Sequence, residues 1–277
     1  MADPGSLLAH QRRALILDEV RRRGGVRVNE LTRSLNVSDM TIRRDLDVLE
    51  REGLLRKVHG GAVLGDEASS HEPGFEAKSE WETAAKHAIA KAAAALVAPG
   101  SAIALSAGTT THALARELTE VTEVTDLTVV TNSVRTAEVF EAARRTGSAA
   151  STTTVILTGG IRTPSDALVG PIADQAIRSL HVDLLFLGCH GLGTDTGLTT
   201  PNLAEAETNR AFLRSARRTV LLADHTKWSA IGLTTFAALE EVDVLVTDSL
   251  PQEEAVAVTE RVGEVLLAAG PAQERPW

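Results

Sequence analysis

Several loops in the second half of the chain are rich in glycine, serine and threonine, and they contain the residues best suited to bind a small anion. The most informative loop has Gly108 after an apolar, strand-like run, followed by three threonines that open a helix. Backbone N–H groups and hydroxyl groups at such a helix start can bind a phosphate. The loop has no Walker lysine, so it is not an ATP-binding P-loop. The alternative interpretation is a plain N-cap built from threonine.

Further candidate binding residues follow other strand-like runs. In an open α/β sheet, small molecules bind beyond the carboxyl ends of the strands. Lys227 could supply a countercharge to a phosphate, although a single loop lysine is more often solvated. Asp224 and Asn132 could orient sugar hydroxyl groups, or could only bond to the loop backbone. The candidate binding residues are Ser106, Gly108, Thr109, Thr110, Thr111, Asn132, Ser133, Gly159, Gly160, His190, Asp224 and Lys227.

Catalytic and metal-binding patterns are weak in this sequence. Cys189 beside His190 suggests a thiol nucleophile, but neighbours on an extended segment point to opposite sides. The eight histidines include no His-x-x-x-His pair, and with a single cysteine a zinc site is not expected. There is no Gly-x-Ser-x-Gly elbow. We therefore expect no catalytic residue, no metal and no cofactor.

A second set of functional candidates lies on an amphipathic helix over residues 38–53. Ser38 is a good N-cap, and Gly53 is a good C-terminal stop. Ile42, Leu46 and Leu49 form its buried stripe. The side chains that lie off this stripe near the helix start are Met40, Thr41, Arg43 and Arg44. Two arginines and a hydroxyl group suit a helix in a DNA major groove, although an ordinary charged surface helix has the same pattern.

The segments around this helix predict a winged helix-turn-helix over residues 7–64. Helices are expected over 7–23 and 29–35, with Asn36 in the tight turn because asparagine tolerates positive φ. A hairpin is expected over 54–64 around a Gly-Gly turn. The candidate DNA-binding residues are Arg27, Ser38, Met40, Thr41, Arg43, Arg44, Arg56, Lys57 and His59. The alternative is a winged helix that contacts only protein.

Charge is unevenly distributed along the chain, with a basic N-terminal stretch joined to an acidic remainder. The 277 residues suggest about two domains, and the net charge is −9. Residues 10–60 contain twelve Lys/Arg against eight Asp/Glu, so this stretch is +4 and the remainder −13. The single cysteine excludes an intramolecular disulfide and suits a reducing cytoplasm. We expect no membrane span and no secretory signal, because the chain has no long apolar run or leader.

The rest of the chain alternates apolar strands with helices, which favours a mostly parallel sheet covered on both faces. Residues 65–80 are rich in Gly, Ser, Pro and acids and are predicted as a linker. Strands are expected over 101–105, 127–131, 153–157, 182–187, 219–223 and 243–247, and helices over 82–97, 110–118, 134–143, 171–179 and 203–214. A further helix after Pro251 and a last strand over 264–268 complete the prediction.

These motifs together resemble the DeoR family of bacterial transcriptional regulators, over about residues 7–250. The motifs that carry the resemblance are Val37-Ser38-x-x-Thr41-Ile42-Arg43-Arg44-Asp45-Leu46, Leu54-Leu55-Arg56-Lys57-Val58-His59-Gly60-Gly61-Ala62, Gly108-Thr109-Thr110, Thr131-Asn132-Ser133, Thr158-Gly159-Gly160, Leu168-Val169-Gly170-Pro171, Gly197-Leu198-Thr199-Thr200-Pro201-Asn202 and Ala223-Asp224-His225-Thr226-Lys227. The resemblance implies an operator-binding head that works as a dimer or larger oligomer. It also implies a sensor domain similar in fold to ribose-5-phosphate isomerase, with phosphorylated sugars as effectors.

Two positions depart from the family pattern. The family generally has Asp-Ser before Gly-Thr-Thr, where this chain has Ser106-Ala107, and Ala-Asp-Gly where it has Cys189-His190-Gly191. A sugar-phosphate isomerase needs a carboxylate to move protons between carbons. Histidine can act as a base, but the loss of both acids favours a sensing pocket over a catalytic one, and it leaves the identity of the ligand open.

We therefore expect a multidomain α/β protein. It has an N-terminal winged helix-turn-helix (7–64), a linker (65–80) and a C-terminal Rossmann-like α/β sensor domain similar to ribose-5-phosphate isomerase (81–268). The expected function is that of a cytoplasmic repressor of a sugar-metabolism operon. Its expected partners are double-stranded operator DNA, a phosphorylated sugar that releases it, and further copies in a homodimer or homotetramer. The alternatives are an isomerase-like enzyme with an accessory head and a structural adaptor.

Overall fold

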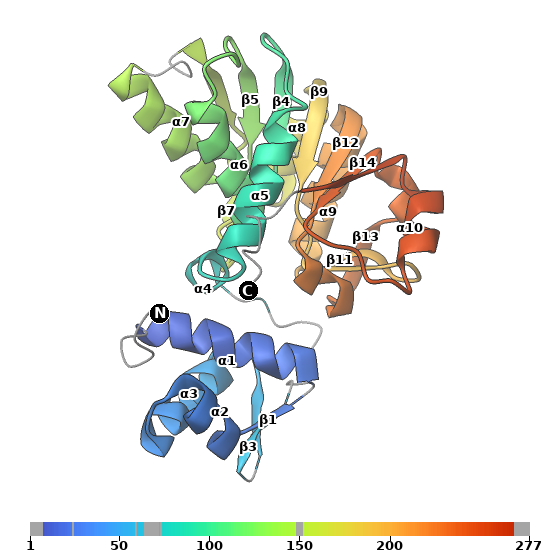
Figure 1. Ribbon diagram of the computed structural model, residues 1–277. Helices are drawn as coiled ribbons and strands as arrows, with labels where there is room; N and C mark the ends of the chain where they lie inside the picture. The colour runs from blue at the N-terminus through green and yellow to red at the C-terminus, as the bar shows by residue number, and fades with distance from the viewer. Residues whose placement is uncertain are drawn as a thin grey trace, which may run out of the picture. The chain divides into compact units, whose positions relative to one another are not determined.

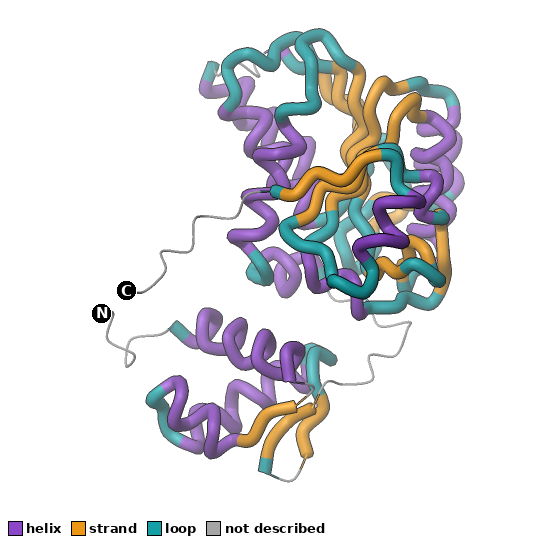
Figure 2. Tube along the Cα trace, turned by 45° about the vertical axis from the view of Figure 1, so that its right-hand side comes forward, coloured by secondary structure: helices purple, strands orange, loops and turns teal. Residues whose placement is uncertain are grey.

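The computed structural model describes residues 8–23, 25–58, 60–63, 72, 74–147 and 152–268. The chain divides into two units, Met1–Trp81 and Glu82–Trp277. Figures 1 and 2 show the elements of each unit.

The first unit is a winged helix-turn-helix, as predicted. Its elements are α1 (Ala9–Arg23), β1 (Gly25–Arg27), α2 (Val28–Leu35), α3 (Asp39–Arg51), β2 (Arg56–Val58), β3 (Gly61–Val63) and α4 (Phe75–Ser79). The strands form an antiparallel sheet in the order β1-β3-β2. Strand β1 was not predicted, because three residues are too few to show a period of two and its partner β3 is distant in sequence.

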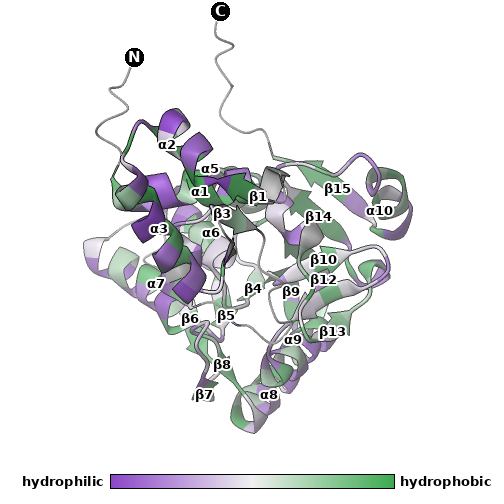
Figure 3. Ribbon diagram, turned by 90° about the horizontal axis from the view of Figure 1, so that it is seen from below, coloured by the Kyte–Doolittle hydropathy of each residue, from purple (hydrophilic) through white to green (hydrophobic). Residues whose placement is uncertain are grey.

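The predicted start and stop of α3 are both present. The Ser38 side chain accepts a hydrogen bond from the backbone N–H of Thr41 at 3.2 Å. At the other end Gly53 has a φ of 75°, and Leu54 N–H donates to the Leu49 carbonyl at 2.9 Å, as in a Schellman motif. The predicted stripe is buried in the unit's core, and hydrophilic and hydrophobic residues alternate along α3 in Figure 3.

The predicted linker contains a short helix at its end. Residues 64–71 and 73 lie outside the described part of the chain. In the segment that follows, α4 begins with Phe75, whose side chain is only 7% exposed, and Trp81 packs against the apolar core of the first unit. The sequence analysis did not predict this helix, because five residues give no clear helical period. The domain boundaries 7–64, 65–80 and 81–268 stay a prediction.

The second unit is built on a seven-stranded parallel sheet with the order β15-β14-β12-β9-β4-β5-β6. Its strands are β4 (Ala102–Leu105), β5 (Thr128–Thr131), β6 (Thr154–Leu157), β9 (Val182–Leu187), β12 (Ala216–Leu222), β14 (Val244–Thr247) and β15 (Glu264–Leu267). All six predicted strands and the last strand are confirmed, with bounds shifted by a few residues. The Rossmann-like fold is therefore confirmed.

Helices cover both faces of this sheet (Figure 2). They are α5 (Thr83–Ala94), α6 (Thr109–Glu120), α7 (Val134–Thr146), α8 (Pro171–Arg178), α9 (Leu203–Ser215) and α10 (Ala255–Arg261). One apolar cluster contains residues of α5, α6 and α7, and a second contains residues of α8, α9 and α10. Strand β4 contributes Ile103 and Leu105 to the first cluster and Ala104 to the second, as alternation requires.

Smaller strands beside the main sheet were not predicted. They are β7 (Ile161–Arg162), β8 (Leu168–Val169), β10 (Gly191–Gly193), β11 (Gly197–Thr200) and β13 (Thr234–Ala237), together with the 3₁₀ helices η3 (His225–Ser229) and η4 (Leu239–Glu241). These runs are short and rich in glycine and threonine, so they look like loops. Gly197 shows what the packing requires: its φ is 65°, and a Cβ there would lie 2.3 Å from the Ala237 carbonyl oxygen.

The chain reverses its direction of travel across the sheet at β4. It passes from β4 to β5 and β6 on one side, and then returns to build β9, β12, β14 and β15 on the other. The loops after β4 and β9 therefore leave the sheet in opposite directions. A crevice at such a switch point is where ligands bind in open α/β folds.

Asn36 allows a test of the tight turn before α3. It is the C-cap of α2 and has a φ of 50°. We expect Asn36→Ala to lower the free energy of unfolding of the first unit by about 1 kcal/mol, because alanine disfavours the left-handed region. Asn36→Gly is the matched control and should be neutral or stabilising. Urea unfolding followed by circular dichroism measures both, and equal losses in the two variants would contradict this account.

Candidate functional site

The start of α3 presents a polar, solvent-exposed face. Met40 is 81% exposed, and Arg43 and Arg44 are exposed beside a partly buried Thr41. The Thr41 and Ser38 hydroxyl groups lie 2.8 Å apart and hydrogen-bond to each other. An exposed methionine with two arginines offers apolar and hydrogen-bonding contacts to base edges. The structure thus brings together the five residues predicted at this helix start.

The two arginines of this face differ in their partners. Arg43 donates from Nε to Asp39 Oδ1 at 2.5 Å, and this hydrogen bond with its charge attraction raises the pKa of Arg43. Among the described residues Arg44 has no ion pair. Arg44 is therefore ready to bind an anion or a base, whereas Arg43 must first leave Asp39.

The wing carries further predicted residues. Lys57 forms an ion pair with Asp47 of α3, and the hydrogen bond from Lys57 lowers the pKa of Asp47. The backbone N–H of Lys57 donates to Glu50 Oε1 at 2.8 Å, so the wing is held to α3. Arg27 is exposed at the end of β1 in the same sheet. The Arg56 side chain and His59 lie outside the described part of the structure.

A buried ion pair that the sequence analysis missed fixes α3 against α1. Arg12 Nε donates to Asp45 Oδ2 at 2.6 Å, and the side chains are only 11% and 6% exposed. Asp45 lies three residues after Ile42 and four before Leu49, so its spacing from the buried stripe was a signal that could have identified it. Removing either partner would leave an uncompensated buried charge, so the pair disfavours arrangements that separate α1 from α3.

In the second unit, Ser106 joins the two loops that part at the switch point. Its backbone N–H donates to the Phe186 carbonyl at 3.0 Å, and its hydroxyl accepts from the Gly188 N–H at 3.2 Å. The side chain is 2% exposed. Ser106 therefore holds the start of the loop after β9 against the end of β4.

Asn132 joins the loops after β4 and β5 to β8. Its Oδ1 accepts from the Ala107 N–H at 2.7 Å, and its Nδ2 donates to the Leu168 carbonyl at 3.0 Å. The neighbouring Ser133 is the N-cap of α7 and accepts from Thr136 N–H. Both residues are nearly fully buried, so in this structure they position loops through the backbone.

The first turn of α6 has an uncapped start. The N-cap is Gly108, which supplies no side-chain hydrogen bond, and the three threonines occupy the first helical positions. The Thr111 hydroxyl donates to the Gly108 carbonyl at 3.0 Å, and Thr110 is 6% exposed. A helix start without a capping side chain leaves N–H groups for an anion. The threonine N-cap interpretation is not what the structure shows, because glycine holds that position.

Asp224 is a buried carboxylate after β12 and the N-cap of η3. Its Oδ1 accepts from Thr226 N–H at 3.0 Å, while its buried Oδ2 accepts no hydrogen bond from the residues that the structure describes. Burial raises the pKa of Asp224, but the charge of Lys227, hydrogen bonds from Thr226 and the charge of Lys86 lower it further, so the net shift is downward. The group is a carboxylate with one free oxygen.

Lys86 of α5 was missed by the sequence analysis. It is 5% exposed and lies on the same helical face as Ile89 and Ala93, both of which are fully buried. A lysine in register with buried apolar residues was the signal that could have identified it, because such a lysine needs a charged partner.

Glu205 is a second residue that the sequence analysis missed. The hydroxyl groups of Thr163 and Thr200 donate to its carboxylate at 3.2 and 3.1 Å, and Ser165 donates to the same oxygen as Thr163. Asn202 caps the helix α9 that carries it. Thr163 and Ser165 are distant in sequence, so local spacing could have shown only the Thr200 partner.

The remaining candidates lie in the loops after β9 and β6. His190 follows β9, and its N–H donates to the Thr199 carbonyl at 3.0 Å. Gly159 and Gly160 follow β6, the edge strand, and a Cβ on Gly160 would lie 2.6 Å from the Val169 carbonyl oxygen. These glycines thus pack against β8 and α8, away from the switch point.

Cys189 is unsuited to nucleophilic chemistry. Burial raises the pKa of its thiol to about 12, so the thiolate is scarce at neutral pH. The side chain packs against the second apolar cluster.

The fold and these sites define a helix-turn-helix transcriptional regulator with a separate α/β domain. Residues 12–68 match the family described as the DeoR-like helix-turn-helix domain, and residues 81–249 match the DeoR C terminal sensor domain. The chain belongs to the DeoR family of transcriptional regulators. Among the described residues, no helix has the length and apolar character to cross a membrane.

Individual relatives agree with this assignment. The chain is 37% identical to the HTH-type transcriptional regulator GlpR of Haloferax volcanii, over 87% of this chain and 91% of that protein. It is 31% identical to the lactose phosphotransferase system repressor of Staphylococcus aureus, over 88% and 94%. Among solved structures, ribose 5-phosphate isomerase A of Methanocaldococcus jannaschii aligns with a TM-score of 0.37 and 18% identity, over 52% of this chain and 54% of that one.

Arg44 on the exposed face of α3 and Lys57 on the wing are expected to contribute to DNA binding in different ways. We expect Arg44→Ala to weaken binding to a duplex selected from a random-sequence pool by ~1–3 kcal/mol and to relax specificity. Lys57→Ala should instead weaken all sequences alike and reduce the salt slope by about one. Arg145→Ala, an exposed arginine of α7, is the control. Fluorescence anisotropy at several salt concentrations measures all three, and an unchanged affinity for Arg44→Ala would contradict the assignment.

His225 predicts a pH-dependent stability of the second unit. The hydrogen bond from Nδ1 to Asp248 Oδ2 at 2.6 Å, with the charges of Asp248 and Glu82, raises the pKa of His225 to about 9 against the opposing effect of burial. The ordinary value is about 6.5, so the stabilisation is complete below that pH and is lost as pH rises through about 9. We therefore expect the gap in Tm between the wild type and Asp248→Asn to shrink as the pH rises.

Thermal unfolding between pH 6 and 10 measures this gap. Glu240→Gln is the control: it removes the partner of Arg261, which stays charged throughout, so its gap should not follow the same curve. A gap for Asp248→Asn that is the same at pH 6 and pH 10 would contradict the linkage.

Proposed function

We propose that this regulator is a repressor of a sugar-metabolism operon, released from its operator by a phosphorylated sugar or a related metabolite. It acts in the cytoplasm as a homodimer or homotetramer, with α3 and the wing on double-stranded operator DNA. Support for the DNA-binding part comes from the family and from the exposed Arg44 and Met40 beside Thr41. The curated relatives include a repressor whose name refers to a lactose phosphotransferase system.

The observation that carries the effector proposal is the buried carboxylate of Asp224. Its free Oδ2 and the positive charges of Lys227 and Lys86 suit a ligand with both hydroxyl and anionic groups. Strands β12 and β4 are both neighbours of β9, so the strand ends from which the Asp224 loop and the start of α6 continue lie about 10 Å apart, two strand spacings. A sugar phosphate can span this distance, with its phosphate at Thr109 and Thr110 and its hydroxyl groups at Asp224.

The site favours sensing over catalysis. The position where the family generally has an acid is held by Ser106, whose hydroxyl is occupied by Gly188 N–H. The Cys189 thiol is protonated at neutral pH. The relatives that match nearly the whole chain are transcriptional regulators.

Ligand binding is tested by a thermal-shift screen of pentose and hexose phosphates, with the unphosphorylated sugars and inorganic phosphate alongside. A ligand at 100 times its Kd should add ~2.7 kcal/mol of stability. We expect a phosphorylated sugar to stabilise the wild type and Lys91→Ala, an exposed lysine of α5, but to stabilise Lys227→Ala much less. A binder should also weaken operator binding 5–150-fold, the range of a ~1–3 kcal/mol coupling.

Two outcomes would contradict the proposal. One is a ligand that binds at the site and leaves operator affinity unchanged. The other is turnover of the bound sugar phosphate by the full chain, which would favour the isomerase-like alternative.

A further inference from the structure

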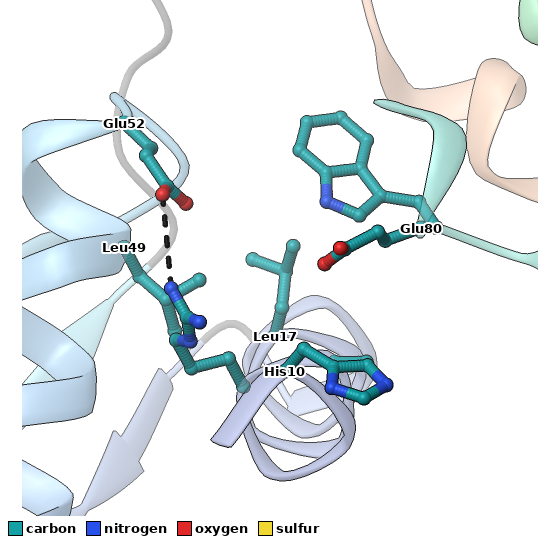
Figure 4. Close-up of a pocket in the computed structure, with 8 residues that line it drawn as sticks. His10, Leu17, Leu49, Glu52 and Glu80 are labelled. Carbon is teal, nitrogen blue, oxygen red and sulfur yellow. Dashed lines mark ion pairs between the residues drawn. The ribbon is translucent and has the colours of Figure 1, made fainter. Parts of the chain in front are cut away.

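The outward face of α3 is held in place by contacts on the opposite side of the helix. Leu49 of the buried stripe lines a small hollow with Leu17 of α1, and both side chains are almost fully buried (Figure 4). Beside them, Arg13 of α1 and Glu52 at the C-cap of α3 form an ion pair at 3.8 Å, which Figure 4 marks with a dashed line. Turning α3 about its axis would break these contacts, so one fixed set of side chains faces outward.

Helical geometry identifies the side chains at the centre of this outward face. With about 3.6 residues per turn, side chains at i, i+4 and i+7 share one side of a helix. Opposite the buried stripe lie Met40, Arg44, Asp47 and Arg51. Asp47 is paired with Lys57 of the wing, and Arg51 Nε donates to the Asp47 carbonyl at 3.1 Å. Met40 and Arg44, on the first two turns of α3, are therefore the central side chains that can reach into a groove.

Thr41 and Arg43 flank this centre. Successive residues of a helix are turned by about 100° around its axis, so Thr41 and Arg43 lie on opposite sides of Met40. In a helix-turn-helix, the second helix lies in the major groove with its N-terminal residues on the base edges, and the phosphates lie along both sides of the groove. Thr41 and Arg43 are thus placed toward the phosphates, and Met40 and Arg44 toward the base pairs.

The chemistry of the two central side chains limits what each can recognise. Met40 is 81% exposed, and among the described residues no other large apolar side chain is as exposed. Its thioether has no hydrogen-bond donor, and the apolar group that the major groove presents is the methyl group of thymine. Arg44 carries a planar fork of N–H donors, which fits the O6 and N7 acceptors of guanine.

We propose that Met40 recognises the methyl group of a thymine in the operator, within about two base-pair steps of a guanine that Arg44 recognises. The two side chains are four residues apart on α3, which is ~6 Å along the helix axis, whereas stacked base pairs are ~3.4 Å apart. Arg43 and Thr41 bind phosphates and contribute little to the choice of base. This inference rests on the proposed function, because it names the bases that operator DNA presents to α3.

The assignment is tested by changing single atoms or groups of the DNA. The probe is a duplex that the wild-type full-length chain selects from a random-sequence pool. Each thymine in turn is replaced by deoxyuridine, which lacks only the methyl group, and each guanine in turn by 7-deazaguanine, which lacks the N7 acceptor. Fluorescence anisotropy measures the Kd of every duplex for the wild type and for Met40→Ala, Met40→Leu, Arg44→Ala and Arg43→Ala.

The wild type and the variants should respond differently to these duplexes. In the wild type we expect deoxyuridine at one thymine to weaken binding about fourfold, the effect of one buried methyl group. We expect 7-deazaguanine at one guanine within two steps of it to weaken binding at least fivefold. Met40→Ala should abolish only the thymine effect, and Arg44→Ala only the guanine effect. Met40→Leu should keep the thymine effect, because leucine preserves an apolar contact.

Arg43→Ala is the matched control on the same helix. It should keep both base effects while it weakens all duplexes alike and reduces the salt slope by about one. The side chains of Met40, Arg43 and Arg44 are all exposed, so these variants should fold, and far-ultraviolet circular dichroism checks that they do.

Methyl nuclear magnetic resonance reports on the same contact directly. The chain has two methionines, Met1 and Met40, so methionine-labelled protein gives a simple methyl spectrum, and Met40→Leu identifies the Met40 signal. In the complex we expect a nuclear Overhauser effect between the Met40 methyl group and the methyl group of the sensitive thymine. Deoxyuridine at that position should remove it.

Three results would overturn the inference and leave the proposed function intact. The first is a wild type that binds the selected duplex and tolerates deoxyuridine at every position. The second is a thymine effect that persists unchanged in Met40→Ala. The third is a sensitive thymine more than two steps from the sensitive guanine. A wild type that selects no duplex from the pool would instead contradict the DNA-binding part of the proposed function, and the inference with it.

Discussion

The architecture of the second unit depends on one pairing, the parallel ladder between β4 and β9. These strands are far apart in sequence, and their pairing places the first strand of this sheet, β4, in its interior, with later strands on both sides. Where their loops part, Ser106 bonds to Gly188 across the gap, and Asn132 ties the next loop in. The helix start at Gly108 and the carboxylate of Asp224 then open toward the same edge because every strand of this sheet runs the same way.

The sequence predicted those parts of the fold that local periodicity encodes. Apolar runs identified the central strands, and Ser38, Asn36 and Gly53 identified the limits of the helix-turn-helix, because capping and positive φ depend on single residues. The strands β1 and β10 were not predicted, since each has three residues and gains its stability from a distant partner. The candidate site was predicted as a set of loops.

What the sequence could not supply was the partner of each side chain. Lys86 acts on Asp224, Glu205 accepts from Thr163 and Ser165, and Arg12 pairs with Asp45, all distant along the chain. Asn132 was predicted either to orient the hydroxyl groups of a bound sugar or to bond only to the loop backbone. In the structure both ends of its side-chain amide are hydrogen-bonded to backbone groups. On the exposed face of α3 and on the wing, Asp39 and Asp47 form ion pairs with Arg43 and Lys57. Phosphates would therefore replace protein carboxylates there, whereas at Arg44 the duplex would replace water.

The third strand of the wing has a consequence for the kind of DNA that this head accepts. Strand β1 continues directly from the end of α1 and pairs with β3, while Lys57 on β2 is bonded to α3. These contacts set the offset between the wing and α3. A head with a fixed offset between helix and wing engages both only where the groove width and local bend of the duplex match that offset. Base pairs that no side chain touches would then contribute to selectivity through their stiffness.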